Sequence, residues 1–167
     1  MELIKYVLRI GMIMIALGII YNTYASDVKT EWNSLSTEER SVIMESYVIG
    51  NDYNLGLTLA AICWQESMGG RWQISTDGND VGLYHINLHW YMKEFHIKDT
   101  IWNRSKYATL LITKPELSRV YVLAKLTNLA RTNHNNWHKV WWRYNGSEEY
   151  ALNIKDKVMY LKTIMIK

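Results

Sequence analysis

The sequence predicts a mainly α-helical domain of about five or six helices with a small β-hairpin. Apolar residues recur three and four positions apart in the C-terminal half, as on one face of a helix. Residues typical of helix starts and helix ends bracket several segments. A stretch rich in turn-forming residues lies between Trp72 and Asn87, where short segments partly alternate in polarity. This stretch is the candidate hairpin.

The first helical segment is predicted from a capping box. Ser36 precedes Glu39 by three residues, a spacing at which each side chain can bond the backbone N–H of the other. We expect a helix from this point to about Ile49. Gly50 and the two polar residues after it then favour a break.

A second helix is predicted over Leu55–Ser67, with Asn54 as its N-cap. Two glycines, Gly69 and Gly70, follow Met68 and end it, because glycine readily adopts the left-handed conformation found just beyond a helix. The hairpin comes next, with its turn at Thr76–Asn79.

Four further helical segments follow the hairpin. A helix is placed at about Trp90–Leu111, where helical and loop signals are mixed. Another runs from Pro115 to about Arg131, with Thr113 as cap and a stripe at the positions that follow. This stripe comprises Leu117, Val120, Ala124 and Thr127.

The last two helices are separated by Asn145–Gly146. The first spans about Trp137–Tyr144 and ends at this pair. Ser147 caps the terminal helix, along which apolar residues repeat on one face. These residues are Ala151, Ile154, Val158, Leu161 and Met165.

Composition limits the classes of function. The 167 residues are 49% hydrophobic with one proline, which favours a single globular domain. A net charge of +3 is too small to indicate nucleic-acid binding, and no nucleic-acid motif is present. The sequence has eight tryptophans and twelve tyrosines, whose side chains combine an apolar ring with a polar group. They suit a partly solvent-exposed surface such as a groove for a polar polymer. Cys63 has no partner for an intramolecular disulfide.

The N-terminal segment resembles an export signal. Lys5 and Arg9 precede the uncharged run 10–20, and small and polar residues follow it, with a cleavage site predicted after Ala25. The run is too short for an ordinary bilayer span, and an uncleaved signal anchor is the alternative. We therefore expect residues 26–167 to form one exported domain in the periplasm or cell envelope. An uncleaved segment would hold it at the inner membrane, at least transiently.

Glu66 is the candidate catalytic residue. It closes an apolar stripe on the second predicted helix, formed by Leu55, Leu59, Ile62 and Cys63. Burial and the negative end of the helix dipole both disfavour the ionised carboxylate, and therefore raise its pKa. A glutamic acid that is protonated near neutral pH can protonate the departing oxygen of a glycosidic bond.

Three short motifs in order carry a resemblance to a known family. They are Glu66-Ser67 followed by Gly69, Gly82-Leu83-Tyr84-His85-Ile86, and Tyr144-Asn145-Gly146 before a terminal helix. Together they resemble the catalytic domain of the soluble lytic transglycosylases, which have a goose-type lysozyme fold. The resemblance covers about Tyr53 to the C-terminus. It implies a lysozyme-like domain that cleaves the peptidoglycan bond between N-acetylmuramic acid and N-acetylglucosamine, forming 1,6-anhydromuramyl ends without a cofactor.

The resemblance also implies roles for individual residues. Glu66 would act first as acid and then as base, and the hydroxyl of Tyr144 would orient it. Backbone groups of Gly82 and Leu83 would bind an acetamido group of the glycan. The implied substrate-binding set is Ser67, Gly82, Leu83, Tyr84, His85, Tyr144 and Asn145. The family usually has methionine and glutamine at the positions of Tyr84 and His85, and often alanine in place of Arg143.

Several alternatives remain open. A hydrolytic muramidase, including a phage endolysin exported by a signal anchor, would use a second carboxylate, for which Asp77 and Asp80 are candidates. A glycan-binding module without turnover is the non-enzymatic alternative. Cys63 as the nucleophile of a thiol peptidase is disfavoured by its position late in an apolar helix.

No metal site is expected, because the histidine pairs four residues apart lack the glutamate of a zinc peptidase motif. The expected partner is the peptidoglycan glycan strand, with Trp72 and Trp90 beside the groove. A secretion, conjugation or pilus assembly machine, or a phage lysis system, is the biological setting that such a small exported enzyme suits.

Overall fold

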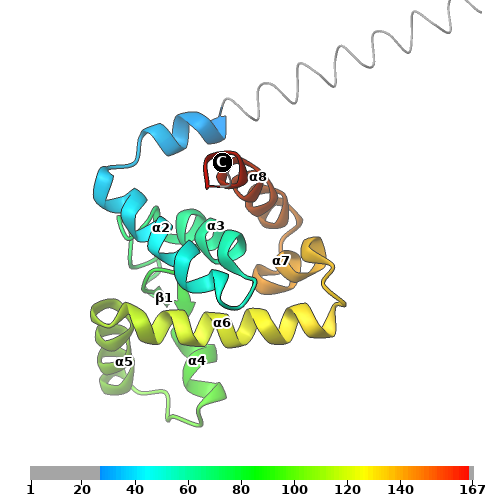
Figure 1. The fold of residues 1–167 in the computed structure, drawn as a ribbon. Coiled ribbons are helices and arrows are strands. Elements are labelled where there is room, and N and C mark those ends of the chain that lie inside the picture. The colour runs from blue at the N-terminus through cyan, green and yellow to red at the C-terminus, as the bar shows by residue number, and fades with distance from the viewer. Residues whose placement is uncertain (1–26, 166–167) are drawn as a thin grey trace, which may run out of the picture. The chain divides into compact units, whose positions relative to one another are not determined.

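The computed structural model describes residues 27–165. The chain divides into two compact units after Ser34, and residues 27–33 of the first unit are helical. The second unit contains all candidate site residues and is described by itself (Figure 1). Its elements are α2 (Thr37–Asn51), α3 (Gly56–Ser67), β1 (Asp80–Val81), β2 (Ile86–Asn87), α4 (Leu88–Glu94), α5 (Ile101–Thr113), α6 (Pro115–Thr132), α7 (Trp137–Asn145) and α8 (Glu148–Met165). The predicted mainly helical class with one small antiparallel sheet is confirmed.

The capping box at the start of α2 is confirmed. Ser36 Oγ accepts from the Glu39 N–H at 3.2 Å, and Glu39 Oε2 accepts from the Ser36 N–H at 2.7 Å. Glu39 also receives two hydrogen bonds from the guanidinium of Arg71, which follows α3. The start of α2 is thereby tied to the segment that leaves α3.

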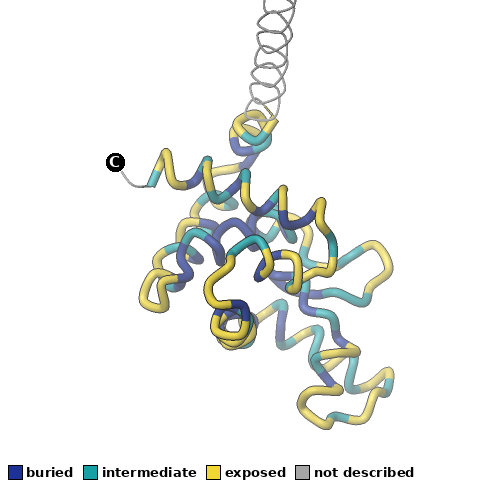
Figure 2. The backbone as a smooth tube through the Cα atoms, turned by 90° about the vertical axis from the view of Figure 1, so that its right-hand side faces the viewer, coloured by how far each residue is buried: buried dark blue, intermediate teal, exposed yellow. Residues whose placement is uncertain are grey.

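Helix α3 forms the centre of the core. Nine of its residues are buried, and it packs against both α2 and α8 (Figure 1). The buried stretches gather in the interior, whereas the exposed ones lie along outer turns (Figure 2). Asn54 is not the N-cap that the sequence suggested: it has φ of 57°, and Leu55 precedes the helix without a side-chain cap. The left-handed residue at the other end is Met68, followed by Gly69 and Gly70 with positive φ.

The turn-rich stretch forms a hairpin as predicted, but the turn that joins its two strands is 82–85, whereas Thr76–Asn79 precede β1. Asp80 pairs with Asn87 and Val81 with Ile86 in antiparallel register, and Ile74 forms a further bridge to Val81. The Gly78 N–H donates to the Ser75 carbonyl oxygen across the predicted turn. His85, in the turn between β1 and β2, brings the hairpin to Glu66.

The single helix predicted over 90–111 is wrong, because this stretch forms α4 and α5. Asn87 caps α4 by accepting from the Trp90 N–H, and Thr100 caps α5 by accepting from the Asn103 N–H. Thr100 therefore starts a second helix within the stretch that was predicted to be one helix. Residues 35–165 therefore contain seven helices instead of the expected five or six.

Helix α6 begins at Pro115 as predicted, but its buried face differs from the expected stripe. Thr113 belongs to α5, and Lys114 precedes α6 without a side-chain cap. Leu117 and Val120 are exposed, as are Ala124 and Thr127. The buried residues are Ser118, Arg119, Val122, Leu123, Leu126 and Ala130.

Helices α7 and α8 follow the prediction closely. Gly146 ends α7 with φ of 91°, and Ser147 Oγ accepts from the Tyr150 N–H at 3.3 Å. Three residues of the predicted α8 stripe are fully buried, namely Ala151, Ile154 and Leu161. In the part of the chain from 27 to 165, we find no helix with the length and apolarity needed to cross a bilayer. The predicted export segment, 1–25, lies outside the described residues.

Candidate active site

A cavity of about 390 Å³ opens beside the end of α3. Its wall combines carboxylates, aromatic rings, amides and one amine. The lining residues are Glu66, Asp80, His85, Ile86, Asn87, Trp90, Tyr121, Lys125, Tyr144 and Asn145. They come from α3, the hairpin, α4, α6 and α7, which are far apart in sequence.

Glu66 is a largely buried carboxyl group on this wall. Its side chain is 14% exposed, and Oε1 accepts a hydrogen bond of 2.7 Å from the Tyr150 hydroxyl. Burial raises the pKa of Glu66 to about 7, and the negative charge of Asp80 adds to this, while the Tyr150 hydrogen bond and Lys125 act in the opposite direction. The predicted upward shift in pKa is confirmed. Glu66 can therefore both give and accept a proton near neutral pH.

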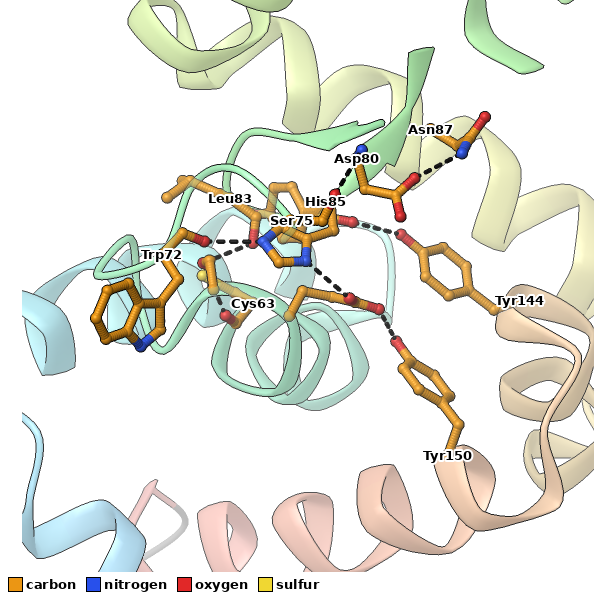
Figure 3. Close-up of polar contacts among 12 residues, drawn as sticks. Cys63, Trp72, Ser75, Asp80, Leu83, His85, Asn87, Tyr144 and Tyr150 are labelled. Carbon is orange, nitrogen blue, oxygen red and sulfur yellow. Dashed lines mark hydrogen bonds and ion pairs between the residues drawn. The ribbon is translucent and has the colours of Figure 1, made fainter. Parts of the chain in front are cut away.

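The tyrosine that holds Glu66 is Tyr150, not Tyr144 (Figure 3). The Tyr144 hydroxyl donates to the backbone carbonyl oxygen of Tyr84 at 3.3 Å. The two rings stack with 6.1 Å between centroids. Tyr144 still lines the cavity, but the hydroxyl that bonds Glu66 belongs to Tyr150 on α8.

His85 reaches Glu66 from the hairpin turn. Its Nε2 lies 2.8 Å from the Trp72 carbonyl oxygen, and its Nδ1 lies 3.5 Å from Glu66 Oε2 (Figure 3). The backbone of His85 has φ of 43°, in the left-handed region that non-glycine residues seldom occupy. The turn therefore aims the imidazole at the carboxyl group.

Lys125 brings a positive charge to the cavity from α6. Its Nζ lies 4.5 Å from the centroid of the Tyr144 ring and 3.5 Å from the Tyr144 carbonyl oxygen. Partial burial lowers the pKa of Lys125, while the negative charges of Glu94 and Glu66 counteract this. An amine in this position would attract an anionic or strongly polar group of a ligand.

Ser67, expected in the substrate-binding set, does not line the cavity. It is fully buried, and its Oγ lies 2.8 Å from the Leu83 carbonyl oxygen and 3.1 Å from that of Cys63. The Gly70 N–H donates to the same Oγ at 3.0 Å. Ser67 thus joins the end of α3 to the hairpin.

The Gly82–Tyr84 segment also serves the fold more than the cavity. The Gly82 N–H donates to the Gln73 carbonyl oxygen, the Leu83 carbonyl oxygen accepts from Ser67, and neither residue lines the cavity. The Leu83 side chain is 5% exposed. Tyr84 is fully buried, with its hydroxyl 2.9 Å from Ser46 Oγ. Of the second motif, His85 and Ile86 line the cavity.

The two candidate second carboxylates differ in position. Asp80 lines the cavity with Glu66, and its Oδ1 accepts from Asn87 Nδ2 at 2.7 Å. Asp77 lies in the turn, where hydrogen bonds from Ser75 and Asn79 lower its pKa to about 2. Asp77 therefore has a role in the turn, and Asp80 is the carboxylate placed near the acid.

Cys63 is fully buried in α3, and burial raises the pKa of its thiol to about 11. It is therefore a core residue and not an activated nucleophile. No group of three or more metal-ligating side chains occurs among residues 27–165. Of the histidines considered as ligand pairs, His89 pairs with Asp99 and His138 with Glu148.

The site contains four residues that the sequence did not indicate. They are Tyr150, Lys125, Asn87 and Tyr121. Tyr150 lies four residues before Ile154 on the buried side of α8, so the helical spacing could have revealed it. Trp90 forms part of the cavity wall as expected, whereas Trp72 contributes its carbonyl oxygen and exposes 62% of its surface.

Three comparisons with known proteins returned no match, whether to a family model, to a curated protein or to a solved structure.

Proposed function

We propose that this chain is a peptidoglycan lytic transglycosylase, which cleaves the β-1,4 bond between N-acetylmuramic acid and N-acetylglucosamine with Glu66 as acid and base. The observation that carries the proposal is the Glu66 carboxyl group itself: it faces the cavity, and its pKa is raised to about 7. The three motifs that resemble the transglycosylase family add support. Glu66, Tyr144 and Asn145 from those motifs meet at the same cavity.

The first step needs a proton on Glu66. The carboxylic acid gives its proton to the glycosidic oxygen while the bond between that oxygen and C1 of the muramyl residue breaks. Tyr150 donates to Oε1 and so stabilises the carboxylate that this step leaves behind. The leaving sugar departs as a neutral alcohol.

The second step returns the proton to Glu66. The carboxylate removes the proton of the muramyl 6-hydroxyl as that oxygen bonds to C1, which closes the 1,6-anhydro ring. Glu66 is then protonated for the next cycle, so no water is consumed and no second carboxylate is required. A pKa near neutrality suits both directions of transfer.

Asp80 favours one alternative, a hydrolytic muramidase. An inverting hydrolase uses a second carboxylate to activate water, and a retaining one uses it as nucleophile. Asp80 lines the cavity and raises the pKa of Glu66 through its charge. The two reactions leave different ends on the glycan, anhydromuramyl for the transglycosylase and reducing muramyl for the muramidase.

Digestion of purified sacculi tests bond, substrate and reaction type together. The released fragments are identified by mass spectrometry, with Glu66→Gln as the inactive control. We expect anhydromuramyl ends from the wild type and no fragments from the variant. Reducing ends would establish the muramidase. Intact sacculi that sediment with the wild-type protein would instead indicate a glycan-binding module.

We further propose that the protein acts outside the cytoplasm, in the periplasm or cell envelope, where it opens peptidoglycan locally or causes lysis. The basis is the signal-like sequence of residues 1–25. The intact mass of the exported protein tests this. A chain beginning at Ser26 would support a cleaved signal peptide, whereas the full-length mass in the membrane fraction would support an anchor.

A further inference from the structure

The hydrogen bonding of His85 determines which ring nitrogen carries its proton. Nε2 lies 2.8 Å from the backbone carbonyl oxygen of Trp72, and a carbonyl oxygen can only accept. Nε2 must therefore be protonated. In the neutral imidazole this leaves Nδ1 with a free lone pair, and Nδ1 is the atom that faces Glu66 Oε2 at 3.5 Å.

The hydrogen bonding of Glu66 determines in the same way which oxygen carries the acidic proton. Oε1 accepts from the Tyr150 hydroxyl at 2.7 Å. Burial raises the pKa of Tyr150 well above 10, so the phenol remains the donor. The proton of Glu66 therefore belongs on Oε2, the oxygen that faces the unprotonated nitrogen of His85.

We propose that His85 is a positioning residue for Glu66, and that the two side chains share one proton between Glu66 Oε2 and His85 Nδ1. The proposal deepens the proposed function, on which it rests, because it names the group that holds the proton of the acid. A separation of 3.5 Å exceeds an ordinary hydrogen bond by about 0.5 Å, and catalytic contacts of this kind commonly shorten when substrate binds.

Sharing a proton would assist the second half of the reaction. Before transfer, Nδ1 accepts from Oε2 and holds the proton on that oxygen, and the O–H bond turns from Nδ1 to the glycosidic oxygen in the first step. After transfer to the glycosidic oxygen, the carboxylate faces a lone pair with no proton between them. That arrangement is repulsive, and it favours removal of a proton from the incoming hydroxyl.

Other charged and titratable groups face the pair from each surrounding element. They are Asp80 from β1, Lys125 from α6, Tyr144 from α7 and Tyr150 from α8. The Tyr144 hydroxyl bonds the Tyr84 carbonyl oxygen and the Tyr150 hydroxyl bonds Glu66 Oε1, so neither occupies Oε2 or Nδ1 (Figure 3).

The test is a pH titration by NMR of the full chain, with 13C-labelled glutamate carboxyl groups and 15N-labelled histidine rings. We expect the Glu66 and His85 signals to move in the same two steps, and His85 to carry its proton on Nε2 above both of them. In His85→Gln the Glu66 signal should follow a single step. In Glu66→Gln the His85 signals should also follow a single step.

The matched control is His89→Gln, which removes a nearby histidine on α4 that pairs with Asp99. This variant should keep both steps. A proton on Nδ1 of the neutral ring, or an unchanged Glu66 curve in His85→Gln, would overturn the proposal. If glutamine does not fold at the positive φ of residue 85, His85→Asn is the substitute, because asparagine tolerates that conformation best.

Activity on sacculi provides a separate result. In His85→Gln, the fall in kcat, about tenfold, should exceed any rise in KM, because the proposed loss acts on the proton of Glu66. A rise in KM without a fall in kcat would instead assign His85 to substrate binding. If the two signals titrate together but the wild-type protein leaves sacculi intact, the proton pair is supported and the proposed function is contradicted. If sacculi are cleaved but the two signals titrate independently, the function is supported and the proton pair is contradicted. The two failures are therefore distinguishable.

Discussion

The chemistry of Glu66 is governed by burial and adjusted by its neighbours. Burial has the largest effect on its pKa, and the Tyr150 hydrogen bond is the largest effect in the opposite direction. Without burial the group would be ionised at neutral pH and could not act as an acid. Without Tyr150 the carboxylate would lose the donor that stabilises it after proton transfer.

The structure predicts that Tyr150, and not Tyr144, controls the acid. In Tyr150→Phe the ionised form of Glu66 loses a hydrogen bond, so the pKa of Glu66 rises further. The alkaline limb of the pH–rate profile should move to higher pH, and kcat should fall about tenfold because the carboxyl group is less well oriented.

Tyr144→Phe is the matched control for that experiment. It removes a hydroxyl that donates to the Tyr84 carbonyl oxygen, not to Glu66. Its pH–rate profile should keep the wild-type alkaline limb. A shifted limb in Tyr144→Phe together with an unshifted one in Tyr150→Phe would return the orienting role to Tyr144.

Glu66 could be proposed from the sequence because one helix contains both this carboxyl group and the apolar stripe that buries it. Its partners could not be assigned in the same way. Tyr144 and Tyr150 are both near the start of the last helix, and which hydroxyl reaches Glu66 depends on how α7 and α8 pack against α3. Ser67 and Tyr84 were expected to face the substrate, but both side chains are buried in the core.

At the level of elements, the junction between α3 and the hairpin positions the site. Gly82 has φ of 80°, and a Cβ there would lie 2.9 Å from the Leu111 carbonyl oxygen and 3.0 Å from Ser118 Oγ. The hairpin thus approaches the end of α5 and the start of α6 at a distance that only glycine permits. Asp80 and His85 belong to the same hairpin, two and three residues from Gly82.

Gly82→Ala should therefore destabilise the protein by at least about 2 kcal/mol, because it combines an unfavourable φ with overlap against backbone. Urea unfolding provides the measurement. Gly78→Ala is the control, since Gly78 has a similar φ of 72° but open space around it, and should cost about 1 kcal/mol. Equal losses in the two variants would show that the close approach contributes nothing.

Ser67→Ala should lower stability by about 1–3 kcal/mol while leaving KM unchanged, since the serine joins α3 to the hairpin and does not reach the cavity. Urea unfolding and cleavage kinetics give the two numbers. Ser105→Ala, on the exposed side of α5, controls for exchanging serine for alanine in a helix. An increase in KM without loss of stability would restore the glycan-binding role.

Local signals predicted the element boundaries better than the element faces. The capping box at Ser36, Pro115 at the start of α6 and Gly146 after α7 each act within a few residues, and all were confirmed. The face of α6 was not predictable in this way. Leu117 and Val120 repeat at helical spacing but are exposed, because the packing of α6 against α5 and α7 buries the opposite residues.

At the scale of the molecule, the acid depends on the whole second unit. The cavity takes residues from the end of α3, the hairpin, α4, α6 and α7, and α8 supplies Tyr150. The high pKa of Glu66 therefore exists only when these segments are assembled. The protein must fold around a group that is harder to ionise in the folded than in the unfolded chain, which links the free energy of unfolding to pH.

Glu66 should consequently destabilise the folded protein as pH rises. Its pKa is about 7 in the folded state against 4.5 in the unfolded chain, so between these values the folded state binds more protons and stability falls with increasing pH. At 1.36 kcal/mol per pH unit, the loss approaches about 3 kcal/mol above pH 7.

Glu66→Gln cannot ionise and therefore does not undergo this loss of stability. In urea unfolding at about pH 4, the wild type and Glu66→Gln should have similar free energies of unfolding. At about pH 8, Glu66→Gln should be more stable than the wild type by up to about 3 kcal/mol. Glu116→Gln, an exposed change on α6, controls for the removal of one negative charge. A Glu66→Gln protein with no advantage at the higher pH would show that Glu66 ionises freely in the folded state, and the acid step of the proposed mechanism would then have no basis.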